Sequence, residues 1–378
     1  MNKIAFVAAV AAALAATAGV ASAQTAPAPA APAAPSLGAV IAATPGLSIT
    51  GYVAGSYTYF DTSSTLLRAY DVKPNGFSAN QASATVSYLP ESGFGGAVSL
   101  IAGNDAKVLN GNDSTFYLNN AYVQYATGGL TVMGGKFSSL AGFESTNPMN
   151  DTTVSRGILF WNMEPGALTG LRASYAVSPA LTVIGGVNNG WGYSGSEPNG
   201  LGKTIELGLT GNPNSMFSYT ADYYRGQSPW FGSSANNGVL QLLDLVGTFN
   251  VNSALTLGAN VDLLSKDNST LANGSIGTAK ANGLALYASY ALTDQFSLAA
   301  RGEYVDDKDG LVSSGNSSTG TANKLKALTL AVNYTPMKNV KLSAEVRQDK
   351  SDNAIFTKKD GSATTKQNSV ELMAVYSF

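Results

Sequence analysis

The residues best suited to chemistry in this chain are arginines and carboxylates placed two positions apart. Arg301 and Glu303 have this spacing in Ala299–Tyr304, and Glu345 and Arg347 repeat it in Leu342–Arg347. In an extended strand, residues two apart point to the same face. Each pair would therefore place both signs of charge on one face, where they can attract or repel ions and polar solutes.

Histidine and cysteine are absent from the whole sequence. Their absence excludes Ser-His and Cys-His nucleophiles and any zinc, iron or copper site ligated by His. No carboxylate pair or Ser-Lys pair has a convergent spacing. We therefore expect neither an enzyme nor a cofactor.

One acidic run, Asp306-Asp307-Lys308-Asp309-Gly310, could hold Ca²⁺ through oxygen ligands. Its spacing does not match an EF-hand loop, and a loop tip of this kind is more often simply solvated. No metal site is predicted.

The element that must position the charges is a β-strand, and the last stretch of the chain shows it most clearly. Every second residue from Val370 to Phe378 is apolar or aromatic, and Glu371 lies on the other face. This alternation predicts a strand with different solvents on its two sides. A strand ending on a bare Phe resembles the terminal strand of outer-membrane barrels, which makes Tyr376 and Phe378 the predicted barrel closure and assembly signal.

The same pattern repeats from Leu47 onward. Pairs of alternating stretches are joined by tight turns such as Thr127-Gly128-Gly129, and longer polar segments such as Asp61–Ser78 and Ser265–Lys280 join the pairs. Seven tight turns and two terminal stretches give about sixteen strands, with both ends on the short-turn side. We predict an all-β fold, a transmembrane antiparallel β-barrel with short periplasmic turns and long extracellular loops.

Aromatic residues cluster at the ends of these stretches and share the apolar parity. They are Tyr88, Phe94, Tyr125, Tyr175, Phe249, Tyr290, Phe296, Tyr334, Tyr376 and Phe378 beside tight turns, and Tyr57, Tyr59, Tyr223 and Tyr304 at loop ends. Two outward rings of this kind are typical of membrane girdles. A soluble secreted sandwich protein, which is the alternative, would bury them.

The other parity should face a water-filled lumen, because a barrel of this size is too wide for side chains to fill. A Lys or Arg facing lipid at the midplane would cost about 2–4 kcal/mol. The predicted pore wall consists of Arg172, Asp244, Arg301, Glu303, Glu345, Arg347 and Glu371, and the same parity turns Glu206, Asp222 and Asp262 inward.

The segment Phe137–Ala167, after the fifth strand, is the longest loop and is unusually apolar. If it were exposed it would form a large apolar patch, so we expect it to fold into the lumen and pack on the wall. The predicted pore constriction is then Glu144, Asp151, Arg156 and Glu164. The alternative is a loop that caps the barrel mouth or contacts a neighbouring subunit.

The N-terminus predicts export. Lys3 precedes an apolar stretch that ends in the cleavage site Ala21-Ser22-Ala23, so residues 1–23 are a predicted signal peptide. Residues 24–46 contain an Ala/Pro-rich tract, which we expect to be an extended periplasmic spacer. The barrel domain is expected over residues 47–378, in the outer membrane of a Gram-negative bacterium.

The charge balance points away from nucleic acid. The chain has 22 Lys and Arg against 24 Asp and Glu, with no basic tract. The expected partners are outer-membrane lipid, the barrel assembly machinery and small hydrophilic solutes.

A spaced signature within the inserted segment carries a family resemblance. Its members are Gly135-Lys136-Phe137, Gly142, Glu144, Asn147, Ser155-Arg156, Phe160, Pro165 and Thr169-Gly170, which resemble the OmpL-like putative beta-barrel porin family. Leu168 stands where that family often has a His. The strand layout also resembles the general diffusion porins. These resemblances imply a channel for passive diffusion of small hydrophilic solutes, constricted by the inserted loop, and a homotrimer.

The wall charges suggest an ion preference. Seven of the ten inward wall residues are acidic and three are basic, and the predicted constriction adds three acidic and one basic. A narrow pore concentrates ions of the opposite sign, so we expect a weak preference for cations. The rival function is a structural or adhesive barrel whose lumen the inserted loop blocks.

Overall fold

The computed structural model describes residues 43–111, 114–191, 202–227, 238–313 and 321–378. The predicted signal peptide and nearly all of the predicted spacer lie outside these ranges. The chain divides into two units, Met1–Ala43 and Thr44–Phe378, and the barrel belongs to the second. In the described part of the chain, no helix has the length and hydropathy needed to cross a membrane.

The second unit is built almost entirely of strands. The first eight are β1 (Leu47–Phe60), β2 (Gly76–Tyr88), β3 (Gly93–Ala102), β4 (Phe116–Thr127), β5 (Leu130–Ser138), β6 (Ala167–Ser178), β7 (Leu181–Asn188) and β8 (Thr204–Asn214). The others are β9 (Phe217–Gln227), β10 (Val239–Asn250), β11 (Leu255–Thr270), β12 (Ile276–Ala291), β13 (Phe296–Asp307), β14 (Asn323–Met337), β15 (Val340–Ser351), β16 (Phe356–Thr357), β17 (Ala363–Thr364) and β18 (Lys366–Ser377).

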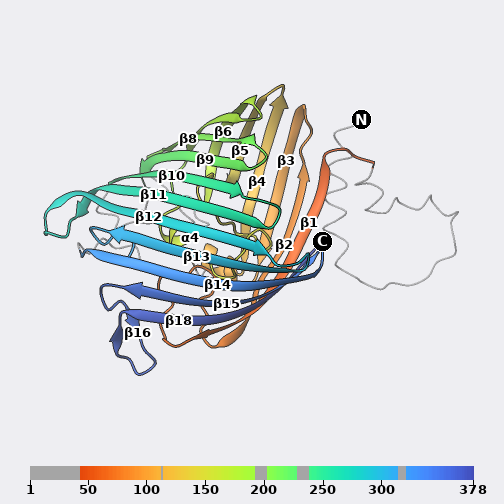
Figure 1. Cartoon of the computed structure of the whole chain (residues 1–378). Helices are drawn as coiled ribbons and strands as arrows, with labels where there is room; N and C mark the ends of the chain where they lie inside the picture. The colour runs from red at the N-terminus through yellow and green to blue at the C-terminus, as the bar shows by residue number, and fades with distance from the viewer. Residues whose placement is uncertain (1–42, 112–113, 192–201, 228–237, 314–320) are drawn as a thin grey trace, which may run out of the picture. The chain divides into compact units, whose positions relative to one another are not determined.

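Sixteen of the described strands form one closed antiparallel barrel, in which β1–β15 follow the sequence order and β18 pairs with both β15 and β1 (Figure 1). At the seam, Gly51 and Phe378 exchange two backbone hydrogen bonds of 3.0 and 2.9 Å. Closure leaves the sheet with no unpaired edge. The predicted sixteen-strand antiparallel barrel is therefore confirmed. β16 and β17 form a separate small hairpin between β15 and β18.

Alternation along each strand separates an outer surface from a lumenal one. In β18, Val370, Leu372 and Tyr376 are exposed, whereas Ser369 and Glu371 are buried. Neighbouring strands continue the outer aromatic ring near the tight turns. The ring centroids of Phe94 and Tyr125 lie 4.9 Å apart, and those of Phe296 and Tyr334 lie 4.5 Å apart.

One predicted loop is wrong. The segment 265–280 was expected to be a long polar loop, but β11 runs to Thr270 and β12 starts at Ile276. Ser269 pairs with Gly277 and Thr270 with Ile276, so the hydrogen-bond ladder continues beyond the apolar part of the strands. Polar composition alone does not end a strand when the partner strand continues beside it. Only the turn 271–275 remains, and Gly274 there takes a left-handed φ of 81°.

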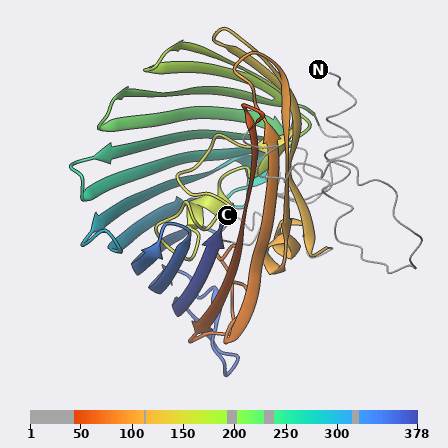
Figure 2. The same ribbon diagram turned by 90° about the vertical axis from the view of Figure 1, so that its right-hand side faces the viewer.

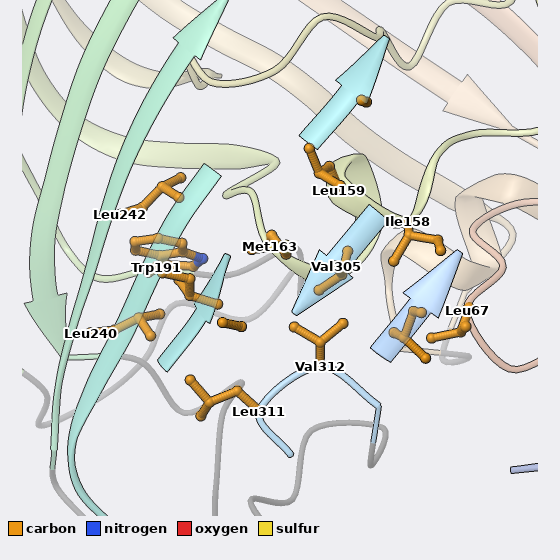
Figure 3. Packing of buried hydrophobic residues seen from close by; sticks show 14 of the residues in the cluster. Leu67, Ile158, Leu159, Met163, Trp191, Leu240, Leu242, Val305, Leu311 and Val312 are labelled. Atoms are coloured by element: carbon orange, nitrogen blue, oxygen red, sulfur yellow. The ribbon is translucent and has the colours of Figure 1, made fainter. Parts of the chain in front are cut away.

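At the end opposite the tight turns, two of the described connections fold inward and contain helices. These helices are α3 (Asn104–Leu109) and α4 (Ile158–Asn162), and α4 belongs to the long loop between β5 and β6. Figure 2 shows this yellow-green loop between the green-to-blue strands and the orange β1 and β2. Ile158, Leu159 and Met163 pack with lumenal side chains such as Val305 (Figure 3). The prediction that the segment Phe137–Ala167 folds into the lumen agrees with this arrangement.

Candidate functional site in the barrel lumen

The inserted loop, residues 137–167, begins against β9, β10 and β11. The backbone N–H of Leu140 donates to the Tyr224 hydroxyl at 2.8 Å, and that of Gly142 donates to Asp244 Oδ2 at 3.0 Å. The next N–H, of Phe143, donates to Asn260 Oδ1 at 2.9 Å. Three consecutive wall strands thus bind loop backbone rather than loop side chains, which fixes the path of the chain itself.

Glycines on the lumenal face of the wall leave space for the loop side chains. A Cβ at Gly208 would lie 2.5 Å from Leu140 Cδ1, and one at Gly258 would lie 2.4 Å from the Phe143 ring. At Gly283 it would lie 2.9 Å from the Met163 sulfur. These three positions on β8, β11 and β12 were not predicted as part of the site. The sequence did contain a signal for them. Each is a Gly at a lumen-facing position of its strand, where other strands carry polar side chains.

The middle of the loop is bound by charged residues of β13 and β15. Arg301 Nη1 lies 2.5 Å from Glu144 Oε1, and the N–H of Ile158 donates to Glu303 Oε1 at 2.6 Å. Glu345 accepts the N–H groups of Val154 at 2.5 Å and of Ser155 at 3.2 Å. Arg301, Glu303 and Glu345 were predicted to line the pore wall. They face the lumen, but they are buried beneath the loop and satisfy its polar groups.

Within the loop, Arg156 organises the turn. Its Nε lies 3.0 Å from Asp151 Oδ2 and donates to the Ser145 carbonyl at 2.7 Å, while its Nη2 reaches the Thr146 carbonyl at 3.2 Å. Burial raises the pKa of Asp151 to about 6, although the Arg156 charge lowers it. The predicted constriction residues Glu144, Asp151, Arg156 and Glu164 are all buried, at 2–8% exposure. They lie inside the loop–wall contact and not on its free surface.

A second charged group lies beneath the loop between β1 and β2, and it was missed by sequence reasoning. Arg68 Nε lies 2.9 Å from Asp71, and its other nitrogens lie 3.7 Å from Asp349 and from Glu371. The predicted wall residue Glu371 therefore faces Arg68 and not open water. The signal for this inward fold was the apolar content of the loop, since Leu67 is buried in the same cluster as Ile158.

Arg347 and Arg172 complete the predicted wall. Arg347 Nη1 donates to the Arg156 carbonyl at 2.6 Å, and its Nη2 lies 2.8 Å from Asp349. On the opposite side, Arg172 makes a two-point contact with Glu206, at 2.6 and 2.9 Å. Its guanidinium also lies 4.2 Å from the Phe137 ring centroid. Both arginines are thus occupied by partners within the lumen.

The helix α3 adds one further buried carboxyl that sequence reasoning missed. Asp105 accepts hydrogen bonds from Gln81 Nε2 at 2.9 Å and Asn80 Nδ2 at 3.3 Å. Burial raises the pKa of Asp105 to about 7, against these hydrogen bonds and the Arg156 charge, which lower it.

The loop does not cover the wall evenly. Inward positions of β10, β11, β13 and β15 that meet the loop are buried. Several inward positions on β4–β7 keep partial exposure, whereas Phe137, Leu168, Arg172 and Asn188 on the same strands are buried. The partly exposed positions are Tyr122, Gln124, Thr131, Met133, Ser174, Thr182 and Ile184. Partly exposed polar positions continue on the short-turn side of the remaining strands, for example Thr220, Thr248 and Thr256.

A closed sixteen-strand antiparallel barrel with a long loop after β5 packed inside its lumen is a porin-type barrel. The chain belongs to the family described as Putative beta-barrel porin-2, OmpL-like, whose model matches residues 46–378. The family resemblance of the sequence signature is thereby confirmed. No curated protein matches the chain.

Solved structures support the fold. The outer membrane channel DcaP of Acinetobacter baumannii is 16% identical, with a TM-score of 0.61 over 88% of this chain and 97% of that one. The trimer form of the outer membrane protein OmpT of Vibrio cholerae is 14% identical, with a TM-score of 0.60 over 88% and 99%. An anion-selective porin from Comamonas acidovorans is 11% identical, with a TM-score of 0.62 over 88% and 99%.

Proposed function

We propose that the chain is an outer-membrane porin through which small hydrophilic solutes and ions diffuse passively. The observation that carries this proposal is the uneven packing of the inserted loop. The loop is bound to β9–β15 by buried hydrogen bonds and ion pairs, whereas inward residues of β4–β7 towards the tight turns, such as Gln124, Thr131 and Thr182, stay partly exposed. The water path would run along β4–β7, beside the loop.

The outer surface supports a location in the outer membrane. Its exposed side chains are largely Leu, Val and Phe, such as Leu207, Leu330 and Leu372, with aromatic residues towards the strand ends. An apolar surface of this kind is stable in contact with lipid, whereas charged side chains on the lipid face would destabilise the barrel. The barrel assembly machinery would recognise the terminal Phe378 at the seam, together with the neighbouring ring of Tyr376.

A weak preference for cations follows from the lumenal charges. The arginines Arg172, Arg301 and Arg347 are each paired with carboxylates. At the predicted inward wall positions, seven carboxylates stand against three arginines. Such an excess of negative charge would raise the local concentration of cations.

The protein would act as a passive channel without catalysis, and its assembly would be a homotrimer. Support for the trimer comes from the likeness to OmpT, a solved structure described as a trimer form. Its substrates would be small hydrophilic solutes of either kind, neutral or charged.

A second candidate, a structural barrel with a blocked lumen, is favoured by one observation. Leu67, Ile158, Leu159 and Met163 form an apolar cluster with Val305 inside the barrel, and apolar packing excludes water from that part of the lumen (Figure 3).

Swelling of liposomes that contain the refolded protein separates the two candidates. The porin predicts that sugars enter at rates that fall as their size increases. No entry of even the smallest sugar, by protein shown to be folded, would support the blocked barrel.

A further inference from the structure

The lumenal wall carries three aspartates on adjacent strands at one level. Asp222 on β9 lies opposite Asp244 on β10, and Asp244 lies opposite Asp262 on β11. Directly opposite residues in antiparallel strands have Cβ atoms about 4.5–5.5 Å apart. The inserted loop brings Glu164 to the same place, and oxygens of Glu164, Asp244 and Asp262 lie within 4.8 Å of one another.

This group is buried, and no Lys or Arg among the described residues forms an ion pair with it. Glu164 is 4% exposed, Asp222 is 2%, and Asp244 and Asp262 are 0%. Arg172, an arginine of the neighbouring wall, is taken by Glu206 at 2.6 Å. Buried carboxylates side by side repel one another and lose hydration, so they need a proton or a cation to be stable.

Hydrogen bonds satisfy only part of the group. Asp244 accepts from the Gly142 N–H at 3.0 Å and from Asn260 Nδ2 at 2.5 Å. Asp262 Oδ2 and both carboxylate oxygens of Asp222 have no hydrogen-bond donor among the described residues. These oxygens therefore keep free lone pairs inside a closed, polar site.

The loop is shaped around Glu164 at this point. Gly142 has a φ of 95°, and a Cβ there would lie 1.9 Å from Glu164 Oε2. The loop thus contacts the wall aspartates at two points, through the Gly142 N–H and through the Glu164 side chain, and it covers them on the lumen side.

We propose that Glu164, Asp244 and Asp262 bind a divalent cation of the Ca²⁺ type, with Asp222 as the adjacent carboxylate. The donor set is oxygen only, which suits a hard cation and excludes the softer metals that select His or Cys. Three carboxylates can supply up to six oxygens, within the coordination number that Ca²⁺ takes. The cation joins the inserted loop to β10 and β11. The sequence alone predicted no metal site, so this proposal departs from that expectation.

Calcium binding to the refolded full-length chain tests this site. Protein in detergent micelles is stripped with EDTA and titrated with CaCl₂ in a calorimeter, and thermal unfolding is followed with and without Ca²⁺. We expect one binding event per chain and a higher unfolding temperature in Ca²⁺, because the ligand binds only the folded state. Asp262→Asn and Glu164→Gln should each weaken binding at least tenfold.

The matched control is Asp306→Asn, which removes a carboxylate from the acidic run 306–309 and should leave binding unchanged. The assay measures binding and not conduction, so its result is independent of the proposed pore. The proposal is overturned if the wild type binds no Ca²⁺ up to about 10 mM, well above the range of weak extracellular sites. It is also overturned if Asp262→Asn and Glu164→Gln bind as the wild type does, because the carboxylates would then be held by shared protons.

Discussion

Arg301 of β13 and Glu144 of the inserted loop form an ion pair of 2.5 Å in which both side chains are buried. The two residues are far apart in the sequence, and their contact fixes the middle of the loop to the wall. Glu144 Oε2 also accepts the Gly157 N–H at 2.5 Å, so one carboxylate binds both the wall and the start of α4.

Glu144→Gln should therefore loosen the loop without unfolding the barrel. Removing the charge weakens hydrogen bonds made by a charged group, each contributing about 1.5–3 kcal/mol. We expect faster tryptic cleavage after Arg156 and a lower unfolding temperature in detergent. Glu91→Gln, at an exposed tight turn, is the control. Equal cleavage of the two variants would show that this ion pair does not hold the loop.

The wall glycines make a second prediction. A Cβ at Gly258 would overlap the Phe143 ring, which is stacked on Tyr287 with centroids 4.1 Å apart. Gly258→Val should displace Phe143, destabilise the chain by about 1–3 kcal/mol through overpacking, and change sugar entry in liposome swelling. The control is Gly302→Val, which is the same substitution at a position where a Cβ would meet no other atom within 4 Å. If both variants behaved alike, the loop would not depend on this space.

Asp105 makes the stability depend on pH. Burial raises its pKa in the folded state to about 7, well above the usual value of an aspartic acid, so the folded state binds the proton more tightly. The stabilisation is complete below pH ~4 and is lost as the pH rises through 7. Asp105→Asn should reduce the fall in unfolding temperature between pH 5 and pH 8, measured by circular dichroism in detergent. A pH profile parallel to that of the wild type would contradict this assignment.

The seam makes a prediction about assembly. Phe378 pairs with Gly51 through two backbone hydrogen bonds, and its ring takes the space that a Cβ on Gly51 would need. Deletion of Phe378 should reduce the folded, heat-modifiable fraction after refolding, because barrel closure loses its last pair. Phe296→Ala removes an exposed ring away from the seam and should refold well. Similar yields for the two variants would contradict a special role of the terminal residue.

The barrel could be predicted from the sequence because its evidence is local. Alternation, as in Val370–Phe378, and turn residues such as Gly128 act within a few positions, and neighbouring strands in the chain are neighbours in the sheet. The inward parity of Asp244 and Glu371 follows from the same alternation.

The contacts of the site could not be predicted in this way. The pairs Arg301–Glu144 and Arg68–Glu371 join segments separated by more than a hundred residues, and no local rule places them together. The adjacency of Asp244 and Asp262 depends on the register of one hairpin, which turn length alone constrains only loosely. The partners of Glu164 depend on the fold of an irregular loop.

Single-channel conductance of the refolded protein in a planar bilayer, with a salt gradient across the membrane, tests the proposed function most directly. A porin with the proposed lumen should give stable conductance steps of porin size and a reversal potential with the sign of cation preference. The absence of any conductance from correctly folded, heat-modifiable barrels would contradict it, and would identify the inserted loop 137–167 as a plug.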